Sequence, residues 1–355
     1  VIFIDLRDRY GLTQVVFDPS HNKEAHKIGD TARREWVLQI EGKVRSRGEL
    51  VNKKLKTGEI EILADKVVVL SKSDTPPIEI DDKKPAGEDI RLKYRYLDLR
   101  RPSMQKNLLN RHKAMKSAMN YLDSQDFIYI ETPVLMKSTP EGARDYVVPS
   151  RVNKGQFYAL PQSPQLYKQI LMVSGVDKYF QFARCLRDED LRSDRQPEHT
   201  QIDLEMSFVE REDVFTVVEG LMKSMWKDVL NVKLETPFPK ISWHDSMNKY
   251  GSDKPDLRFD LEFNDVTELM TKSDFNVYKE VIKSGGIVKC LKVKGAVETY
   301  SRKQIDKLID LAKTHHAKGL SWMKVKDNKL ESNIVKFFSE DIQNKLIKQL
   351  DAKND

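Results

Sequence analysis

The sequence predicts an α+β protein in which a small N-terminal β-barrel precedes a domain built around antiparallel strands. Three observations support this prediction. Short alternating runs separated by turn residues fill the first 75 residues. A helix with signals at both ends is expected at 163–175. Two strand-like runs then flank a charged loop within residues 181–209.

The first region reads as four short strands with one short helix between them. The strands are expected at Val1–Leu6, Leu12–Asp18, Trp36–Val44 and Glu59–Leu70. This spacing is typical of a five-stranded barrel such as the OB fold, which binds nucleic acids in other proteins. A basic run in this region could contact phosphates, although such a run is more often a solvated loop; it comprises Lys43, Arg45, Arg47, Lys53, Lys54 and Lys56.

A linker is predicted at residues 76–95, because the segment SKSDTPPIEIDDKKPAGED is rich in Pro, Asp and Lys. An amphipathic helix is expected after it, and its His112 is interpreted as a packing residue rather than a ligand. The segment FIYIETPVL, Phe127–Leu135, is then predicted to contain a strand that ends at Pro133. Proline within a strand favours an edge or interface position.

The segment QSPQLYKQILMVSG predicts a helix. Ser163 is expected at its N-cap, Pro164 at the first helical position and Gly175 just past its end. Gln165 and Lys168 are three residues apart and therefore share a face near the positive end of the helix dipole. That face suits a small carboxylate, and an ordinary exposed polar face is the alternative.

The stretch QFARCLRDEDLRSDRQPEHTQIDLEMSFV has two strand-like runs around a loop crowded with Arg, Asp and Glu. In the second run, Thr200–Val209, polar residues alternate with apolar ones, which predicts one polar and one buried face. The first run, Tyr179–Leu186, ends at Arg187, so the two strands are expected to be antiparallel neighbours. Long loops in compact domains are usually functional or disordered, but the charge alone fits a solvated surface loop equally well.

The composition is that of an ordinary globular protein: 355 residues, 39% hydrophobic and 33% charged, with a net charge of +6. Only Cys185 and Cys290 are present, which argues against a disulfide framework or a zinc site and for a reducing compartment. No apolar run approaches membrane-spanning length. A cytoplasmic protein is expected. The mitochondrial matrix stays open, because the chain begins inside an apparent strand and a targeting segment could have been removed.

Several long motifs occur in a fixed order along the chain. They are IETPVL at 130–135, TPEGARDYVVPSR at 139–151, FYALPQSPQLYKQILM at 157–172, RDEDLRSDRQPEHTQIDLEMSF at 187–208 and YGSDKPDLRF at 250–259. Together they resemble aspartyl-tRNA synthetase of the bacterial or mitochondrial type, a class II enzyme of subclass b. The class I signatures HIGH and KMSKS are absent. One departure is Asp126, which stands where the family has Gly.

The resemblance implies four parts. Residues 1–75 would be an anticodon-binding OB domain without its N-terminus, 76–95 a linker, 96–259 a class II catalytic domain with motifs 1 and 2, and 260–355 the truncated start of an inserted α/β (GAD-like) domain. The chain contains no GxGxxR, so motif 3 and the metal-ligating acids near it are missing. The catalytic domain is therefore expected to be incomplete.

The resemblance also implies that the charged loop binds ATP. The residues concerned are Arg187, Asp188, Glu189, Arg195, Gln196 and His199. Arg187 is the expected catalytic residue, because negative charge builds on the phosphoryl oxygens when a carboxylate attacks the α-phosphorus. His199 replaces the Phe that stacks on adenine in most relatives, and its smaller ring predicts weaker ATP binding.

The implied aspartate pocket comprises Glu141, Ser163, Gln165, Lys168, Arg187 and Asp203. Gln165 and Asp203 would hold the substrate ammonium with support from Ser163, and Glu141 would lie on a mobile loop that closes over the site. Lys168 would meet the side-chain carboxylate. Because asparagine would leave the Lys168 ammonium unpaired, this residue would select aspartate.

In the N-terminal region, the resemblance implies anticodon contacts by Phe3, Gln14 and Glu61. A flat ring beside amide and carboxylate groups suits splayed bases, whereas a core Phe and ordinary surface residues are the alternatives. Pro133 matches the motif 1 proline and is expected at a homodimer interface.

The expected function is ligation of L-aspartate to tRNA(Asp) with ATP, and charging of tRNA(Asn) is left open. Magnesium is implied, with no ligand in this chain. No membrane association is expected. The alternative is a catalytically incomplete RNA-binding fragment on the same scaffold. An asparagine-specific or lysine-specific relative is disfavoured by TPEGARDY and by the pairing of Gln165 with Lys168.

Overall fold

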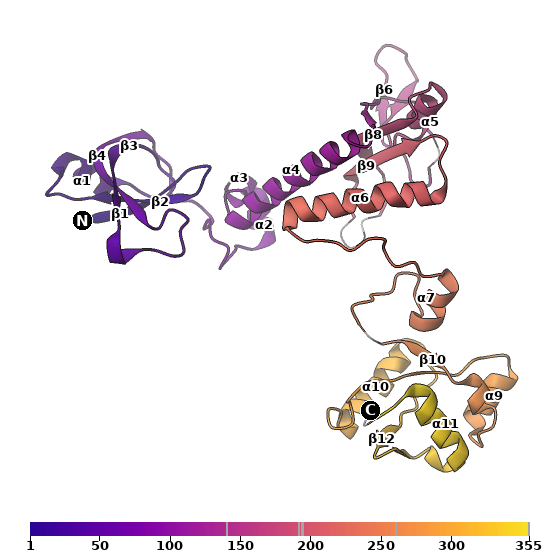
Figure 1. Ribbon diagram of the computed structural model, residues 1–355. Coiled ribbons are helices and arrows are strands. Elements are labelled where there is room, and N and C mark those ends of the chain that lie inside the picture. The colour runs from indigo at the N-terminus through magenta and orange to yellow at the C-terminus, as the bar shows by residue number, and fades with distance from the viewer. Residues whose placement is uncertain (140, 191, 193–194, 260, 354–355) are drawn as a thin grey trace. The chain divides into compact units, whose positions relative to one another are not determined.

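The computed structural model describes residues 1–139, 141–190, 192, 195–259 and 261–353. The chain divides into two compact units, Val1–Pro237 and Phe238–Asp355, whose elements are shown in Figure 1. The domain boundary predicted between residues 259 and 260 lies inside the second unit. No helix within the described ranges combines the length and the apolar character that a membrane span needs.

The N-terminal sheet has four strands in the order β1-β2-β4-β3. They are β1 (Ile2–Arg7), β2 (Leu12–Phe17), β3 (Val37–Ser46) and β4 (Ile60–Ser71), with helix α1 (Lys23–Thr31) between β2 and β3. All four predicted strands are confirmed within two residues at each end. A fifth strand does not occur among the described residues of this region. Buried side chains of Val15, Phe17, Ala25, Ala64 and Val67 form its core.

Close packing of α1 on this sheet depends on a glycine. A Cβ at Gly29 would lie 2.9 Å from the Phe17 ring, so a side chain here would push the helix away from the core. The helix begins at Asn22, whose side chain accepts hydrogen bonds from the backbone N–H groups of Glu24 and Ala25. A short 3-10 helix, η1 (Gly48–Leu50), lies within the predicted basic loop.

The predicted linker is partly helical, since α2 (Glu88–Lys93) and the start of α3 (Arg95–Asp98) lie within it. Asp98 is fully buried and accepts hydrogen bonds from the guanidinium groups of Arg95 at 2.6 Å and Arg101 at 2.7 Å. These contacts supply the partners that a buried carboxylate requires. They tie the end of α3 to the start of α4 (Pro102–Asp123).

A three-stranded sheet in the order β5-β8-β9 forms the centre of the following region. Strand β8 (Lys178–Leu186) pairs antiparallel with β9 (Glu198–Met206) along its whole length, as the sequence predicts, and β5 (Ile128–Tyr129) pairs parallel with β8. Helices α4 and α6 (Arg211–Leu230) lie side by side (Figure 1). Ala118, Leu122, Phe127, Phe180 and Leu221 join these helices to the sheet.

Two short strands and one helix complete this region. Strands β6 (Val147–Pro149) and β7 (Phe157–Ala159) form a hairpin. Helix α5 (Gln165–Val173) contacts both β8 and β9. It therefore covers part of the sheet that would otherwise face solvent.

Three expectations about these elements are wrong. Strand β5 has two residues, and Pro133 lies in an exposed segment beyond it. Strand β9 ends at Met206, because Ser207 turns away to donate to the Asp177 carbonyl, and Phe208 is 98% exposed. His112 is exposed rather than packed.

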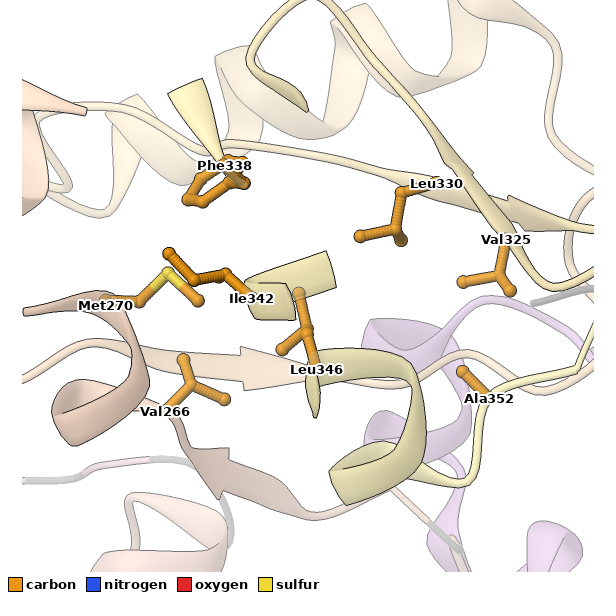
Figure 2. Close-up of a cluster of buried hydrophobic side chains, with 8 residues drawn as sticks. All are labelled: Val266, Met270, Val325, Leu330, Phe338, Ile342, Leu346 and Ala352. Atoms are coloured by element: carbon orange, nitrogen blue, oxygen red, sulfur yellow. The ribbon is translucent and has the colours of Figure 1, made fainter. Parts of the chain in front are cut away.

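The second unit is an α/β structure with its own core. Its elements are α7 (Trp243–Tyr250), β10 (Phe263–Asp265), α8 (Thr267–Met270), α9 (Asn276–Lys283), β11 (Lys289–Leu291), α10 (Arg302–Thr314), β12 (Lys324–Lys326), β13 (Lys329–Glu331), η2 (Val335–Phe337) and α11 (Glu340–Leu350). Strands β10 and β11 pair, as do β12 and β13. Figure 2 shows the core side chains Val266, Met270, Val325, Leu330, Phe338, Ile342, Leu346 and Ala352.

Candidate functional site

Helix α5 begins one residue later than predicted. Its N-cap is Pro164, whose carbonyl accepts the first helical hydrogen bond from the Lys168 N–H at 3.0 Å. Ser163 lies one residue before the N-cap, and its hydroxyl still accepts a hydrogen bond from the Gln165 N–H at 3.3 Å. It thereby satisfies one of the backbone N–H groups that the first turn of a helix leaves unpaired. Gly175 follows the end of the helix at φ +83°, as predicted.

Lys168 points from the first turns of α5 to strand β9. Its Nζ lies 2.9 Å from Asp203 Oδ1 and 3.2 Å from Glu205 Oε2. Burial lowers the pKa of the Lys168 ammonium, but the hydrogen bonds and charges of the two carboxylates outweigh burial and leave that pKa above its ordinary value. The ammonium is therefore charged at neutral pH.

Asp203 is buried, although the alternation of β9 places it on the polar face. Its side chain is buried because α5 packs over that face of the strand. The Oδ2 oxygen has no hydrogen-bond partner among the described residues. Burial raises the pKa of the Asp203 carboxyl, and the Lys168 contact opposes this shift. An unpartnered, buried carboxylate oxygen is costly and suits a cationic ligand.

A polar network lies beneath Asp203. Gln181 is its register partner on β8, and the Gln181 Oε1 accepts from the Tyr179 hydroxyl at 2.8 Å and from the Thr132 hydroxyl at 2.9 Å. Tyr179 is fully buried, and burial followed by the Asp203 charge raises the pKa of its hydroxyl. The network holds the Gln181 side chain in place next to Asp203.

Glu141 lies close to the start of α5. The Ser163 hydroxyl donates to Glu141 Oε2 at 2.6 Å, and the Thr139 hydroxyl lies 3.4 Å from Glu141 Oε1. Through Ser163, whose hydroxyl also accepts from the Gln165 N–H, three predicted aspartate-binding residues come together.

Arg187 directly follows β8, and its backbone N–H donates to the Pro197 carbonyl at 2.8 Å. This bond closes the base of the charged loop. The Arg187 Nε is buried and has no hydrogen-bond partner among the described residues. A buried guanidinium N–H without an acceptor suits an anionic ligand.

A polar cavity of about 530 Å³ is formed by the charged loop and by the loop that follows Glu141. Gly142, Ala143, Arg144, Asp188, Glu189, Asp190, Arg192 and Arg195 line it. The Asp188 N–H donates to the Arg144 carbonyl at 3.1 Å, which joins the loop around Glu141 to the charged loop. Arg195 and Glu189 form an exposed ion pair at 3.6 Å.

The remaining predicted ATP residues lie farther along the loop. Gln196 is exposed, whereas His199 is half-buried on β9 opposite Cys185. Leu191, Ser193 and Asp194 lie outside the described residues.

The pKa of the buried Cys185 thiol is affected by charged residues of both the predicted aspartate pocket and the predicted ATP-binding loop. Burial raises its pKa to about 11; the charges of Arg187 and Lys168 lower it, and those of Asp203 and Glu141 raise it. All four charged groups therefore lie within electrostatic range of one sulfur atom. The structure thus brings Arg187, Lys168 and Asp203 into one neighbourhood.

Two residues of this neighbourhood are missing from the predicted site. Glu205 lies two positions after Asp203 on the same strand face, a spacing that could have identified it. Gln201 accepts a hydrogen bond from the Cys185 thiol at 3.3 Å, and it is also two positions from Asp203.

The N-terminal sheet brings Gln14 and Glu61 together. The Gln14 amide donates to Glu61 at 3.2 Å and accepts from the Arg47 guanidinium at 2.8 Å, while Arg45 donates to Glu61 at 2.8 Å. Phe3 is 61% exposed. The register places it opposite Val16, on the same sheet face as Gln14. The sequence marked Arg45 and Arg47 only as part of a basic run.

No group of three or more His, Cys, Asp or Glu side chains that could hold a metal ion occurs within the described residues. None of the described residues is assigned to magnesium.

Two family models match the chain. One, described as tRNA synthetases class II (D, K and N), matches residues 87–345, and the other, described as an OB-fold nucleic acid binding domain, matches residues 1–70. The expected fold, an N-terminal OB domain followed by a class II synthetase catalytic domain, is confirmed.

Among curated proteins, an aspartate–tRNA(Asp/Asn) ligase of Desulfatibacillum aliphaticivorans is 53% identical over 353 residues, covering 99% of this chain and 59% of that protein. An aspartate–tRNA ligase of Macrococcus caseolyticus is 52% identical, covering 100% of this chain and 60% of that protein. The chain thus spans about 60% of the length of the curated relatives it matches.

A solved structure of asparaginyl-tRNA synthetase from Pyrococcus horikoshii complexed with asparaginyl-adenylate has a similar fold. Its TM-score is 0.57 at 22% identity, covering 65% of this chain and 51% of that one. At this identity the likeness concerns the fold alone. The family match over residues 87–345 rests on the sequence itself, and it shows that this chain belongs to the class II tRNA synthetases of the D, K and N group.

Proposed function

We propose that this chain carries the anticodon-binding part and the aspartate- and ATP-binding part of an aspartate–tRNA ligase. The observation that carries the proposal is the direct contact of Lys168 with Asp203, together with two buried polar atoms, Asp203 Oδ2 and Arg187 Nε, that have no hydrogen-bond partner among the described residues. The names of the relatives at 52–53% identity support the same activity. In this reaction the aspartate α-carboxylate attacks the α-phosphorus of ATP and displaces pyrophosphate, which gives aspartyl-adenylate. A hydroxyl of the terminal ribose of tRNA then attacks the aspartyl carbonyl and displaces AMP.

Lys168 and Asp203 would bind opposite ends of the amino acid. Lys168 would pair with the side-chain carboxylate, and the unpartnered Asp203 Oδ2 would accept from the ammonium, helped by Gln165. Ser163 and Glu141 would close the pocket from the loop side. Asparagine is disfavoured, because its neutral amide leaves the charge of Lys168 without a compensating carboxylate.

Arg187 would neutralise the α-phosphate, which would give its buried Nε the acceptor that it does not have among the described residues. Asp188, Glu189, Arg195, Gln196 and His199 would hold the rest of the nucleotide along the polar cavity. A fixed guanidinium is worth most where charge develops in the transition state.

Phe3, Gln14 and Glu61 would contact the tRNA anticodon on the N-terminal sheet. Arg45 and Arg47 hold the Gln14–Glu61 pair in place, so its free polar atoms have fixed directions for reading a base edge. We also propose a homodimer with Pro133 at its interface, a cytoplasmic location, and tRNA(Asp) as the RNA partner.

The test is pyrophosphate exchange into ATP by the whole native protein to which this chain belongs, with aspartate or asparagine as the amino acid. Aspartate should support exchange and asparagine should not. Arg187→Ala is expected to lower the exchange rate by roughly a hundred-fold to a thousand-fold with the fold intact. Lys168→Ala is expected to abolish the preference for aspartate, because the charge that selects it is gone.

Lys223→Ala, exposed on α6, is the matched control and should behave like the native protein. A folded native protein without aspartate-dependent exchange would contradict the ligase proposal and favour a non-catalytic RNA-binding protein. Full activity in Arg187→Ala or Lys168→Ala would contradict the role of that residue.

A further inference from the structure

We propose that Gln162 is a positioning residue for aspartate binding, which fastens the loop of residues 141–146 so that Glu141 faces the start of α5. The inference rests on the proposed function and adds a residue that lies within the motif at 157–172 but to which the sequence analysis assigns no role. Gln162 directly precedes Ser163, and its side chain makes hydrogen bonds to the backbone of Ala143 in the loop.

The Gln162 amide pairs with the loop backbone as a neighbouring strand would. Its Oε1 accepts from the Ala143 N–H at 3.2 Å, and its Nε2 donates to the Ala143 carbonyl at 3.0 Å. The same Nε2 donates to Asp145 Oδ1 at 2.5 Å. Gln162 is 3% exposed, so these bonds are shielded from water. Only a side chain with both a donor and an acceptor at this reach can make all three.

The bonds from Gln162 to Ala143 restrict Glu141, because Ala143 is only two residues farther along the loop. Gly142, at φ +103°, separates Glu141 from Ala143, and at that backbone angle a residue with a Cβ would be strained. Fixing Ala143 therefore fixes one side of a flexible joint. Glu141 itself is exposed, and its bond to the Ser163 hydroxyl alone would hold it weakly.

Other contacts extend the attachment on both sides. The Ser138 hydroxyl donates to Asp145 Oδ2 at 2.5 Å, so Asp145 links Gln162 to the beginning of the loop. The Asp188 N–H donates to the Arg144 carbonyl, so the loop also meets the residue after Arg187. Through these bonds Gln162 sets the distance between Glu141, Ser163 and the charged loop.

Gln162→Glu is the sharpest variant. A carboxylate can still accept from the Ala143 N–H, but it cannot donate to the Ala143 carbonyl, and it repels Asp145. In pyrophosphate exchange by the native protein, the KM for aspartate should rise roughly five-fold to a hundred-fold, the range expected when a buried partner is lost. The rate at saturating aspartate should change much less, because Gln162 touches no reacting atom.

Gln162→Glu combined with Asp145→Asn supplies the rescue. The amide introduced at position 145 can donate to the carboxylate introduced at position 162, while the carbonyl oxygen of that amide accepts from Ser138. The KM should therefore fall part of the way back to the native value, because the contact with position 145 is restored while the Ala143 carbonyl still lacks its donor. Gln169→Glu makes the same chemical change at an exposed position of α5 and is the matched control. Hydrogen exchange of the Ala143 amide should quicken in Gln162→Glu, because the remaining bond to the carboxylate loses the neighbouring bond to the Ala143 carbonyl and the repelled Asp145 loosens the loop, and it should slow again in the double variant.

The two proposals fail in different ways. If the ligase proposal is wrong, the native protein shows no aspartate-dependent pyrophosphate exchange. Hydrogen exchange of the Ala143 amide then still shows whether Gln162 holds the loop. An unchanged KM together with unchanged Ala143 exchange in Gln162→Glu would overturn the inference. If Gln162→Glu does not fold, Gln162→Met, of similar length and without a buried charge, takes its place with the same expected rise in KM. A native KM in that variant would overturn the inference equally.

Discussion

At the residue scale, Lys168 lies between two carboxylates before any substrate arrives. Asp203 and Glu205 leave this group with one net negative charge. Aspartate brings a carboxylate for Lys168 and an ammonium for Asp203, so each end of the substrate compensates a charge already in place. Binding therefore depends on Asp203 being ionised.

This dependence gives a prediction for pH. Burial raises the pKa of the Asp203 carboxyl above its ordinary value of 3.8, so its charged form is lost at a higher pH than an exposed carboxyl would require. Lys168 stays charged in that range, because its pKa is shifted upward. The KM for aspartate is expected to rise as pH falls through the raised pKa of Asp203, while free aspartate is still ionised.

The measurement is the KM for aspartate in pyrophosphate exchange from pH 7 downward, with the KM for ATP as the internal control. Asp203→Asn should have a high KM and lose the pH dependence, since the titrating group is gone. A constant KM for aspartate down to the ordinary carboxyl range would show that Asp203 is not the ammonium ligand.

The sequence could predict which residue types gather at the site, but not all of their contacts. Helical spacing predicts that Gln165 and Lys168 share a face, and strand alternation places Asp203 on the polar face of β9. Burial of Asp203 and its contact with Lys168 depend on how α5 packs on the sheet, which spacing does not encode. Gln162 has no periodic signal at all, because its contacts come from a loop that folds back across 17 residues.

At the element scale, helices α4 and α6 pack closely because one of them carries a glycine at the contact. A Cβ at Gly220 would lie 1.9 Å from the Tyr121 hydroxyl oxygen and 2.6 Å from its ring carbon. Tyr121 packs against the cluster of Ala118, Leu122 and Phe180. The ring therefore has little room to move aside.

Gly220→Ala is expected to lower the free energy of unfolding of the first unit by up to about 2 kcal/mol, because overpacking costs about 1–3 kcal/mol and the gain in helix propensity returns only about 1 kcal/mol. Denaturant unfolding followed by circular dichroism measures this change. Lys223→Ala, exposed on the same helix, should change stability by less than about 0.5 kcal/mol. An increase in stability for Gly220→Ala would mean that the two helices separate easily.

The positions of the strands are easier to predict from the sequence than the residues at which the strands end. Alternation identifies β8 and β9 and their antiparallel pairing, because one face of each is apolar. The end of β9 is decided by the hydrogen bond from Ser207 to Asp177, a residue outside the alternating pattern. Strand β5 is shorter than the apolar run that predicts it, because only Ile128 and Tyr129 pair with β8.

At the scale of the whole molecule, the second unit is the part that the motifs describe least. No motif residue assigned to aspartate or ATP lies in it, yet the match to the class II synthetase model extends through it to residue 345. Its core joins α8, β12, β13 and α11, so residues about 80 positions apart pack against one another (Figure 2). A core of this kind supports folding without the rest of the chain.

Residues 238–353, produced alone, are therefore expected to unfold in one cooperative transition. Ile342→Ala or Leu346→Ala should lower the free energy of unfolding of this fragment by about 2–5 kcal/mol, because each leaves a cavity in the shared core. Lys345→Ala, on the exposed face of α11, should cost no more than about 0.5 kcal/mol through its ion pair with Asp341. Denaturant melts of the fragment and of residues 1–237 separate the two units. A fragment without a cooperative transition would show that its core is completed by chain from elsewhere.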